Sequence, residues 1–272
     1  MDSIIQIFRP INVIILFFAV LLGSGLCSEL QNNSVISALS AVFVLMGGNA
    51  INDFFDREAD KISHPKRPLP QNKIDGTVII FSALSSMIIG FALAFFLPSE
   101  CVFLAGIAFF VLIIYSISLS GLPVIGNLLI AGLSGLAVLY GAMATNSICA
   151  RAIFAGFIAG SIHLPREIFK DIEDIAGDNA VGRKTLPIIW NARYSGYLGA
   201  LLCILAMIAI VIPYLSGSFG MSYMFIAFIS FILCGMSAIF GGRGFHHTAQ
   251  ILLKLAMGIG ILALWAEILL PT

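Results

Sequence analysis

Long apolar runs alternate with short polar segments along the whole chain. A run of about 20 apolar residues is long enough to cross the hydrocarbon core of a membrane as a helix. We predict nine such spans, at residues 11–30, 34–60, 75–97, 100–119, 124–144, 152–174, 192–214, 221–240 and 248–270. The pattern therefore predicts an all-α integral membrane protein, with nine transmembrane helices in one bundle and a single domain over residues 1–272.

Two of these spans are longer than a membrane requires, and both end in acidic residues. The second span ends in three aspartates spaced three and then four residues apart, and the sixth span ends in three more with the same spacing. They are Asp53, Asp56 and Asp60 in the first acidic motif (residues 52–60), and Asp171, Asp174 and Asp178 in the second acidic motif (residues 170–178). KRPLP follows the first motif at 66–70 and RKTLP follows the second at 183–187, so the chain repeats its chemistry.

The aspartate spacing favours a metal site. Residues four apart on a helix share a face, where like charges repel, and charge near a membrane is costlier still. Oxygen ligands without Cys or paired His suit Mg²⁺ better than Zn²⁺, and Mg²⁺ is usually shared between carboxylates and substrate phosphates. We predict that the two motifs face each other and hold a diphosphate between Mg²⁺ ions. Asn52, Asp56, Asp174 and Asp178 are the best candidate ligands, and Asp53, Asp60 and Asp171 either bind the metal or orient the groups that do.

The basic residues around the motifs allow two interpretations. They can bind the diphosphate or an acceptor phosphate, or they can serve only as topology signals. The candidates for phosphate binding are Lys66, Arg67, Lys170, Arg183 and Lys184. A solvated helix face is the simpler interpretation of either acidic motif alone, but the matched spacing of the two motifs disfavours it.

Composition supports the membrane assignment. Hydrophobic residues make up 60% of the chain and charged residues only 10%, against roughly 25% in soluble domains. The formal net charge is zero, which does not indicate nucleic acid as a partner. The five cysteines are scattered in apolar segments without a metal-binding spacing or a disulfide framework, so we expect small core hydrophobes at Cys27, Cys101, Cys149, Cys203 and Cys234.

Positive charge predicts the orientation. With nine spans, thirteen of the fourteen Lys and Arg residues fall on the side of the N-terminus, and only Arg151 falls opposite. Cytoplasmic loops carry the excess of Lys and Arg, so the N-terminus and both acidic motifs are expected in the cytoplasm and the C-terminus outside. We therefore expect a multi-pass protein of the cell membrane with its site on the cytoplasmic side.

The two acidic motifs resemble those of a known family. N-D-x-x-D-x-x-x-D at 52–60 with K-R-P-L-P, and K-D-x-x-D-x-x-G-D at 170–178 with G-R-K-T-L-P, resemble the two signatures of the UbiA superfamily of intramembrane prenyltransferases. A typical R-P-x-N stands at 9–12, where Asn12 contacts either substrate or a neighbouring helix. One departure is visible: the turn at 118–123 lacks the lysine that members often have there, which puts a phosphate contact from that turn in doubt.

The resemblance implies a bundle whose central cavity opens to membrane lipid and binds Mg²⁺ and a polyprenyl diphosphate. Within the family the second motif is most similar to archaeal digeranylgeranylglyceryl phosphate synthases. That similarity implies geranylgeranyl diphosphate as donor and the hydroxyl of geranylgeranylglyceryl phosphate as acceptor, in archaeal ether lipid synthesis. The alternative is an aromatic or chlorophyll-type acceptor.

The residues fit this chemistry independently of the resemblance. An allylic diphosphate ionises when metal ions and positioned cations stabilise the leaving charge. The residues expected to carry catalysis are Asp56, Asp60, Lys170, Asp171, Asp174 and Asp178. A cation-coupled transporter is the alternative from another class, with its carboxylates at mid-membrane. Acidic residues at span ends, next to cationic loops, disfavour it.

Overall fold

The structure, a computed structural model, describes residues 2–270 and is built from helices, with no strand in that range. The first half holds α1 (Asp2–Ile7), α2 (Pro10–Cys27), α3 (Asn32–Phe55), α4 (Arg57–Ser63), α5 (Gly76–Ala94), α6 (Ser99–Ile114) and the π-helical turn η1 (Tyr115–Leu119). The second half holds α7 (Ile125–Ala144), α8 (Ala150–Ala180), α9 (Leu186–Trp190), α10 (Ala192–Leu215), α11 (Met221–Gly242) and α12 (His246–Leu269).

Eight of the described helices are long and apolar enough to cross a membrane: α2, α3, α5, α6 with η1, α7, α10, α11 and α12. The helix α8, which corresponds to the sixth predicted span, lies beside them and packs against α7, α10 and α12. Charged residues crowd its second half, which sets it apart from the other long helices. The chain is thus an all-helical, multi-pass membrane protein with eight candidate spans among the described residues.

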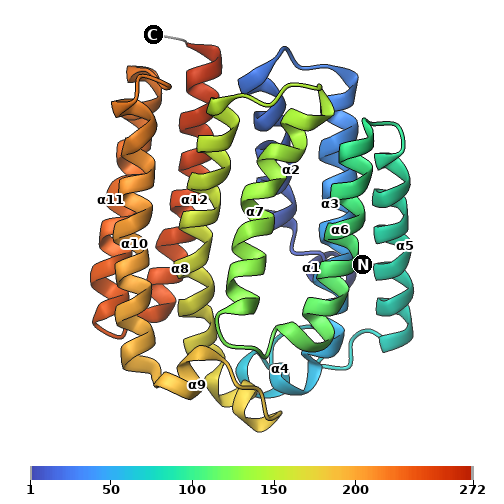
Figure 1. The fold of residues 1–272 in the computed structure, drawn as a ribbon. Coiled ribbons are helices and arrows are strands. Elements are labelled where there is room, and N and C mark those ends of the chain that lie inside the picture. The colour runs from blue at the N-terminus through green and yellow to red at the C-terminus, as the bar shows by residue number, and fades with distance from the viewer. Residues whose placement is uncertain (1, 271–272) are drawn as a thin grey trace.

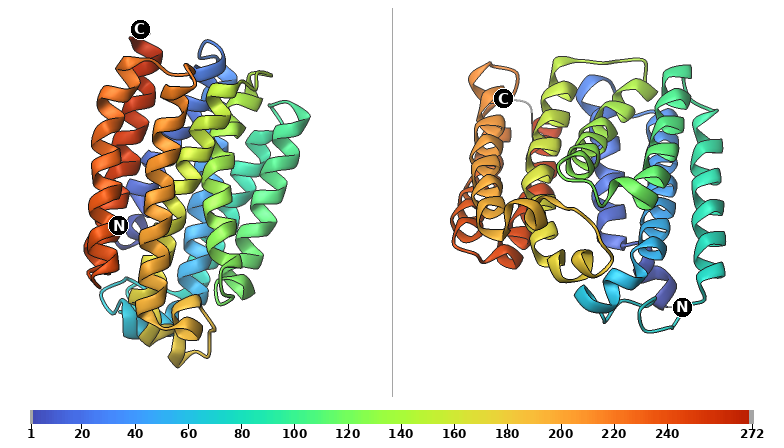
Figure 2. Two further views of the ribbon diagram at one scale, coloured as in Figure 1. Left: turned by 60° about the vertical axis from the view of Figure 1, so that its left-hand side comes forward. Right: turned by 60° about the horizontal axis from the view of Figure 1, so that its bottom comes forward.

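The long helices run side by side in a bundle (Figure 1). In it α10, α11, α12 and α8 pack together, α3 packs with α5 and α6, and α2 and α7 join the two groups. The short helices α4 and α9 lie at one end of the bundle, and the chain finishes near the opposite end (Figures 1 and 2). Helix α4 carries the end of the first acidic motif and packs against α8, which carries the second, so the two motifs meet at that end.

The second predicted span is not one helix. It breaks at Asp56 (φ −83°, ψ −3°), where α3 ends and α4 begins. The Asp56 amide still donates to Asn52 O (2.9 Å), and the Asp60 amide donates to Asp56 O (2.8 Å). The four-residue spacing of the first acidic motif therefore survives the break.

The sixth span was predicted to end at residue 174, with a loop from 175 to 191 before the next span, and this was wrong. Helix α8 continues to Ala180, and α9 occupies part of what remains. The extension is possible because α8 packs closely on α4: a Cβ at Gly177 would lie 2.5 Å from the backbone oxygen of Ala59. All three aspartates of the second motif consequently sit on one continuous helix.

The expectation for the cysteines was wrong for one pair. Cys27, at the end of α2, forms a disulfide with Cys149, which immediately precedes α8. The two residues are 122 positions apart, so local spacing gave no sign of the bond. Cys101, Cys203 and Cys234 are buried free thiols, as expected.

Helices α2 and α7 approach each other at two glycines. A Cβ at Gly141 would lie 1.8 Å from Val20 O, and a Cβ at Gly23 would lie 1.8 Å from Val138 O. The Ser24 hydroxyl donates to Gly141 O at 2.6 Å. Small residues that let backbones approach are a common way to hold membrane helices together.

This contact yields a stability prediction. Gly141→Ala should push α2 and α7 apart and cost about 1–3 kcal/mol, as overpacking does in other tightly packed sites. The readout is the thermal unfolding midpoint of detergent-solubilised protein. Gly132→Ala, also on α7, is the matched control, because a Cβ there meets nothing within 4 Å. Equal midpoints for the two variants would contradict the close packing.

Candidate functional site

The structure brings the two acidic motifs together, as their spacing predicts. Arg183 bridges them: it pairs with Asp56 of the first motif, and its Nη1 lies 3.0 Å from Asp178 Oδ1 of the second. His64 Nε2, just after α4, lies 2.8 Å from Asp174 Oδ1. The Gly177 amide donates to Ser63 Oγ at 3.2 Å. These contacts connect the end of α3, helix α4 and the end of α8.

A small polar cavity lies between the motifs. Predicted ligands from both sides line it: Asn52, Asp56 and Asp60 from the first motif, and Asp174 and Asp178 from the second. Basic residues line it too, namely Arg9, Arg67, Lys170 and Arg183. Asn52 Nδ2 donates to Asp56 Oδ2 at 2.5 Å, which orients that carboxylate.

Two predicted ligands stand outside this cavity. Asp53 pairs with Arg9 (2.5 Å) and lies 3.7 Å from Arg67. Arg9 reaches it from a left-handed backbone conformation (φ 53°) at the start of α2, which is uncommon for a residue other than glycine. Asp171 accepts a hydrogen bond from Asn127 Nδ2 on α7 at 2.8 Å. Their carboxylates therefore face partners on neighbouring elements.

The cluster is unbalanced in charge. Four of the six motif aspartates pair with three arginines: Arg9 at Asp53, Arg67 at Asp60 (2.6 Å), and Arg183 between Asp56 and Asp178. The other two, Asp171 and Asp174, pair with Asn127 and His64, and Lys170 is a fourth cation at the polar cavity. Burial raises the pKa of both Asp60 and Asp178, against the opposing pull of Arg67 and Arg183. Negative charge in excess, within a mostly buried cluster, favours binding of a further cation.

The donor set fits a hard divalent cation. As they stand, the His, Cys, Asp and Glu side chains of residues 2–270 include no group of three arranged to hold a metal ion. Arginines engage several of the carboxylate oxygens instead. Even so, the small cavity collects amide and carboxylate oxygens from both motifs, with negative charge to spare. Oxygen-only donors of this kind are those that Mg²⁺ prefers.

A larger cavity of about 200 Å³ adjoins the polar one, since Arg9, Asn52 and Lys170 line both. Its walls are mainly apolar side chains of α3, α6 and α7. At its far end the hydroxyls of Ser40 and Tyr140 lie 2.9 Å apart. Ser40 precedes Asn52 by three helical turns of α3, so the cavity extends about 18 Å along that helix.

The predicted phosphate-binding residues divide into two groups. Asn12 lines the large cavity, Arg67 and Arg183 line the polar cavity, and Lys170 lines both. Lys66 and Lys184 are exposed and line neither. The turn at 118–123 that lacks a lysine contacts the segment after the second motif, because the Lys184 amide donates to Gly121 O at 3.0 Å.

Sequence reasoning missed several residues that the fold brings to this region. His64 was not singled out, although it contacts Asp174 directly. Arg9 counted only as part of R-P-x-N and as a topology signal. Arg166 counted only as a topology signal and Glu167 was not singled out, although both line the large cavity. The R-P-x-N motif was the one available signal, and it pointed to Arg9.

Comparison with known proteins identifies a family. Residues 12–250 match the UbiA prenyltransferase family. The chain is 34% identical over 268 residues to digeranylgeranylglyceryl phosphate synthase of Thermococcus kodakarensis, covering 96% of each chain.

Solved structures agree in fold as well. One described for digeranylgeranylglyceryl phosphate synthase in membranes is 29% identical, with a TM-score of 0.72 over 97% of this chain and 96% of that one. A UbiA homologue from Archaeoglobus fulgidus bound to GPP and Mg²⁺ shares the fold, with a TM-score of 0.69 at 15% identity over 97% of this chain and 99% of that one. This chain belongs to the UbiA prenyltransferase family.

Proposed function

We propose that this protein transfers a geranylgeranyl group from geranylgeranyl diphosphate to the hydroxyl of geranylgeranylglyceryl phosphate, in archaeal ether lipid synthesis. The observation that carries the proposal is a carboxylate-lined cavity that opens into an apolar cavity deep enough for a long chain. The name of the Thermococcus relative supports this donor and acceptor. The Archaeoglobus homologue bound to GPP and Mg²⁺ supports the metal and the diphosphate.

In this proposal the polar cavity binds the diphosphate end of the donor. Asn52, Asp56, Asp174 and Asp178 would hold Mg²⁺, and Asp60, with its partner Arg67, would help to fix their positions. Bound Mg²⁺ supplies stabilisation of the negative charge that develops on the leaving diphosphate. Arg183 and Lys170 line the same cavity and add positive charge next to that group.

The large cavity would hold the prenyl chain and protect the reacting carbon. When the diphosphate departs, the prenyl group becomes an allylic carbocation. Water would react with this cation, so the site must exclude water. The apolar walls on α3, α6 and α7 do so, and Tyr115 presents an aromatic ring near Lys170. An aromatic face stabilises positive charge nearby.

We also propose nine spans, with α8 as the ninth, the N-terminus and the site in the cytoplasm, and the cell membrane as the location. The bias of Lys and Arg supports this orientation. The disulfide supports it independently. Cys149 immediately precedes α8 and the second acidic motif lies near the end of that helix, so the disulfide and the motif lie at its opposite ends. Disulfides persist mainly in oxidising compartments, which supports a position outside the cytoplasm for Cys27 and Cys149.

The orientation is testable by thiol labelling of intact cells. A membrane-impermeant maleimide should label the protein only after treatment with an impermeant reductant, because the Cys27–Cys149 bond must first open. The control is Cys27→Ser with Cys149→Ser, which retains only the three buried thiols and should stay unlabelled. Labelling without reductant, or none after it, would count against the proposed topology.

Metal binding is testable without turnover. Mg²⁺ with inorganic diphosphate should raise the thermal unfolding midpoint of the purified protein, since a ligand at 100 times its Kd stabilises by about 2.7 kcal/mol. Asp56→Asn with Asp174→Asn should abolish the shift by removing charge from both motifs. Asp75→Asn is the control: Asp75 caps α5 away from the cavity, and asparagine caps equally well. A shift retained in the double variant would refute the metal assignment.

Activity tests the acceptor. With labelled geranylgeranyl diphosphate, the purified protein should prenylate geranylgeranylglyceryl phosphate only when Mg²⁺ is present. Asp56→Ala with Asp174→Ala should lower kcat by at least about 10³-fold, the scale of losing stabilisation of the leaving charge. Transfer to an aromatic acceptor, with none to geranylgeranylglyceryl phosphate, would replace the proposed acceptor with a quinone- or chlorophyll-type one.

A further inference from the structure

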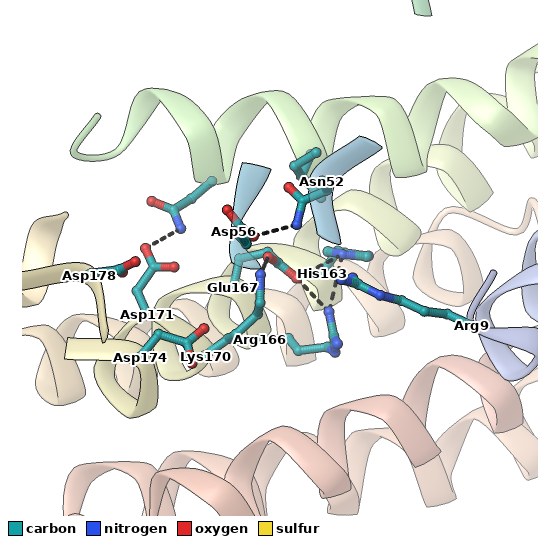
Figure 3. A network of polar contacts seen from close by, with 12 residues as sticks. Arg9, Asn52, Asp56, His163, Arg166, Glu167, Lys170, Asp171, Asp174 and Asp178 are labelled. Carbon is teal, nitrogen blue, oxygen red and sulfur yellow. Dashed lines mark hydrogen bonds and ion pairs between the residues drawn. The ribbon is translucent and has the colours of Figure 1, made fainter. Parts of the chain in front are cut away.

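A second charged cluster lies on α8 just before the second acidic motif, around the buried carboxylate of Glu167 (4% exposed). Arg166 Nη1 donates to Glu167 Oε1, and Lys170 Nζ lies 3.4 Å from Oε2. His163 Nε2 lies 3.2 Å from Oε1, and its Nδ1 lies 2.9 Å from Ser134 Oγ on α7. Figure 3 shows this cluster next to the aspartates of both motifs. All five residues line the large cavity.

The charge of this cluster is opposite to that of the acidic motifs. Arg166 and Lys170 are two cations, and Glu167 is the one carboxylate of the described residues within 4 Å of either. The side chains of Arg166 and Lys170 are only 17% and 23% exposed. Positive charge that is mostly buried and only partly balanced is costly, and more so in a membrane protein. This part of the large cavity therefore favours an anion.

The position of Arg166 separates it from the diphosphate. Lys170 precedes Asp174 by one turn of α8, about 6 Å, whereas Arg166 precedes it by two turns, about 12 Å. The distance of about 12 Å between Arg166 and Asp174 leaves room for a metal–oxygen bond of about 2.1 Å and for the separation of about 3–3.5 Å between the reacting atoms. Lys170 is thus within reach of a diphosphate at the acidic motifs. Arg166 lies one turn further from Asp174 and lines the large cavity but not the polar one.

The guanidinium of Arg166 has donors to spare. Arginine carries five N–H groups, and Nη1 is the one engaged by Glu167. Glu167 holds the guanidinium in place and leaves other N–H groups free to donate to two oxygens of a phosphate. This paired geometry is the one in which arginine binds phosphate best. No such arrangement would be needed for an acceptor without an anionic group.

We propose that Arg166 binds the phosphate of the acceptor lipid, with Glu167 as its positioning residue and Lys170 between this phosphate and the diphosphate. The inference rests on the proposed function, because it assigns the phosphorylated acceptor to one end of the same site. It gives the enzyme two anion sites: one built on metal and aspartates for the donor, and one built on arginine for the acceptor. The second site selects phosphorylated lipid alcohols over neutral ones.

The test compares two acceptors that differ only in the phosphate: geranylgeranylglyceryl phosphate and geranylgeranylglycerol. Arg166→Gln should raise the KM for the phosphorylated acceptor by about 10- to 100-fold, the usual loss for a hydrogen bond to a charged group. It should change the KM for geranylgeranyl diphosphate less than threefold, about the scale of context effects. Turnover of the neutral alcohol should match that of wild type. Arg166→Lys should recover part of the loss, and Arg193→Gln, an exposed arginine on α10, serves as control.

A binding measurement makes the result independent of turnover. Without donor or Mg²⁺, wild type should bind the phosphorylated acceptor more tightly than the neutral alcohol, and Arg166→Gln should remove that difference. Equal losses for both acceptors would show that Arg166 serves only folding, and a raised KM for the donor would place it at the diphosphate; either result overturns the proposal. If wild type binds the phosphorylated acceptor selectively but transfers nothing to it, the proposed function fails and the phosphate site stands.

Discussion

The structure depends on excess negative charge held between two helix ends. Six aspartates meet near the ends of α3 and α8, and three arginines balance only part of their charge. In a partly buried cluster such repulsion is stronger than in water, so the arrangement is stable only with cations between the motifs. Arg183 provides one by pairing with Asp56 and Asp178. The proposed Mg²⁺ would provide the rest, so the charge that is costly to hold between the two helix ends is also the charge that would bind the metal.

Helix α8 organises the opposing charges. Its start is held to α2 by the disulfide between Cys149, just before the helix, and Cys27, and the helix runs first through an apolar stretch. It then carries the cationic cluster around Glu167 and, one turn later, the aspartates of the second motif. Its end packs on α4, which carries part of the first motif. One continuous helix thus sets the distance between the proposed acceptor phosphate and the proposed metal site, which a loop would leave variable.

Much of this could be predicted from sequence because the signals are local. Apolar runs gave the helices, and the spacing of aspartates gave the facing motifs, since helical geometry relates spacing to direction. Long-range facts could not be predicted. Cys27 and Cys149 meet only through the fold. In the sequence Arg166 and Glu167 are two charged residues before the motif. Only the fold shows that they line the same cavity as Asn52.

Local signals also failed where packing overrode them. Asp178 lies on a helix where a loop was expected, since α4 supports the end of α8. Lys66 and Lys184 belong to the repeated motifs, yet both are exposed and line neither cavity, whereas their neighbours Arg67 and Arg183 line the polar one. A repeat in sequence identifies the segment that reaches a site. It does not identify which of two adjacent cations faces inward.

The most direct test of the central claim is anomalous X-ray diffraction from crystals grown with Mn²⁺, which replaces Mg²⁺ at oxygen sites, and a diphosphate analogue of the donor. The account predicts an anomalous peak between the motifs, at about 2.0–2.3 Å from oxygens of Asp56 and of Asp174 or Asp178, with Arg183 turned away from at least one carboxylate. A peak elsewhere, or an Arg183 bridge unchanged with the analogue bound, would contradict it.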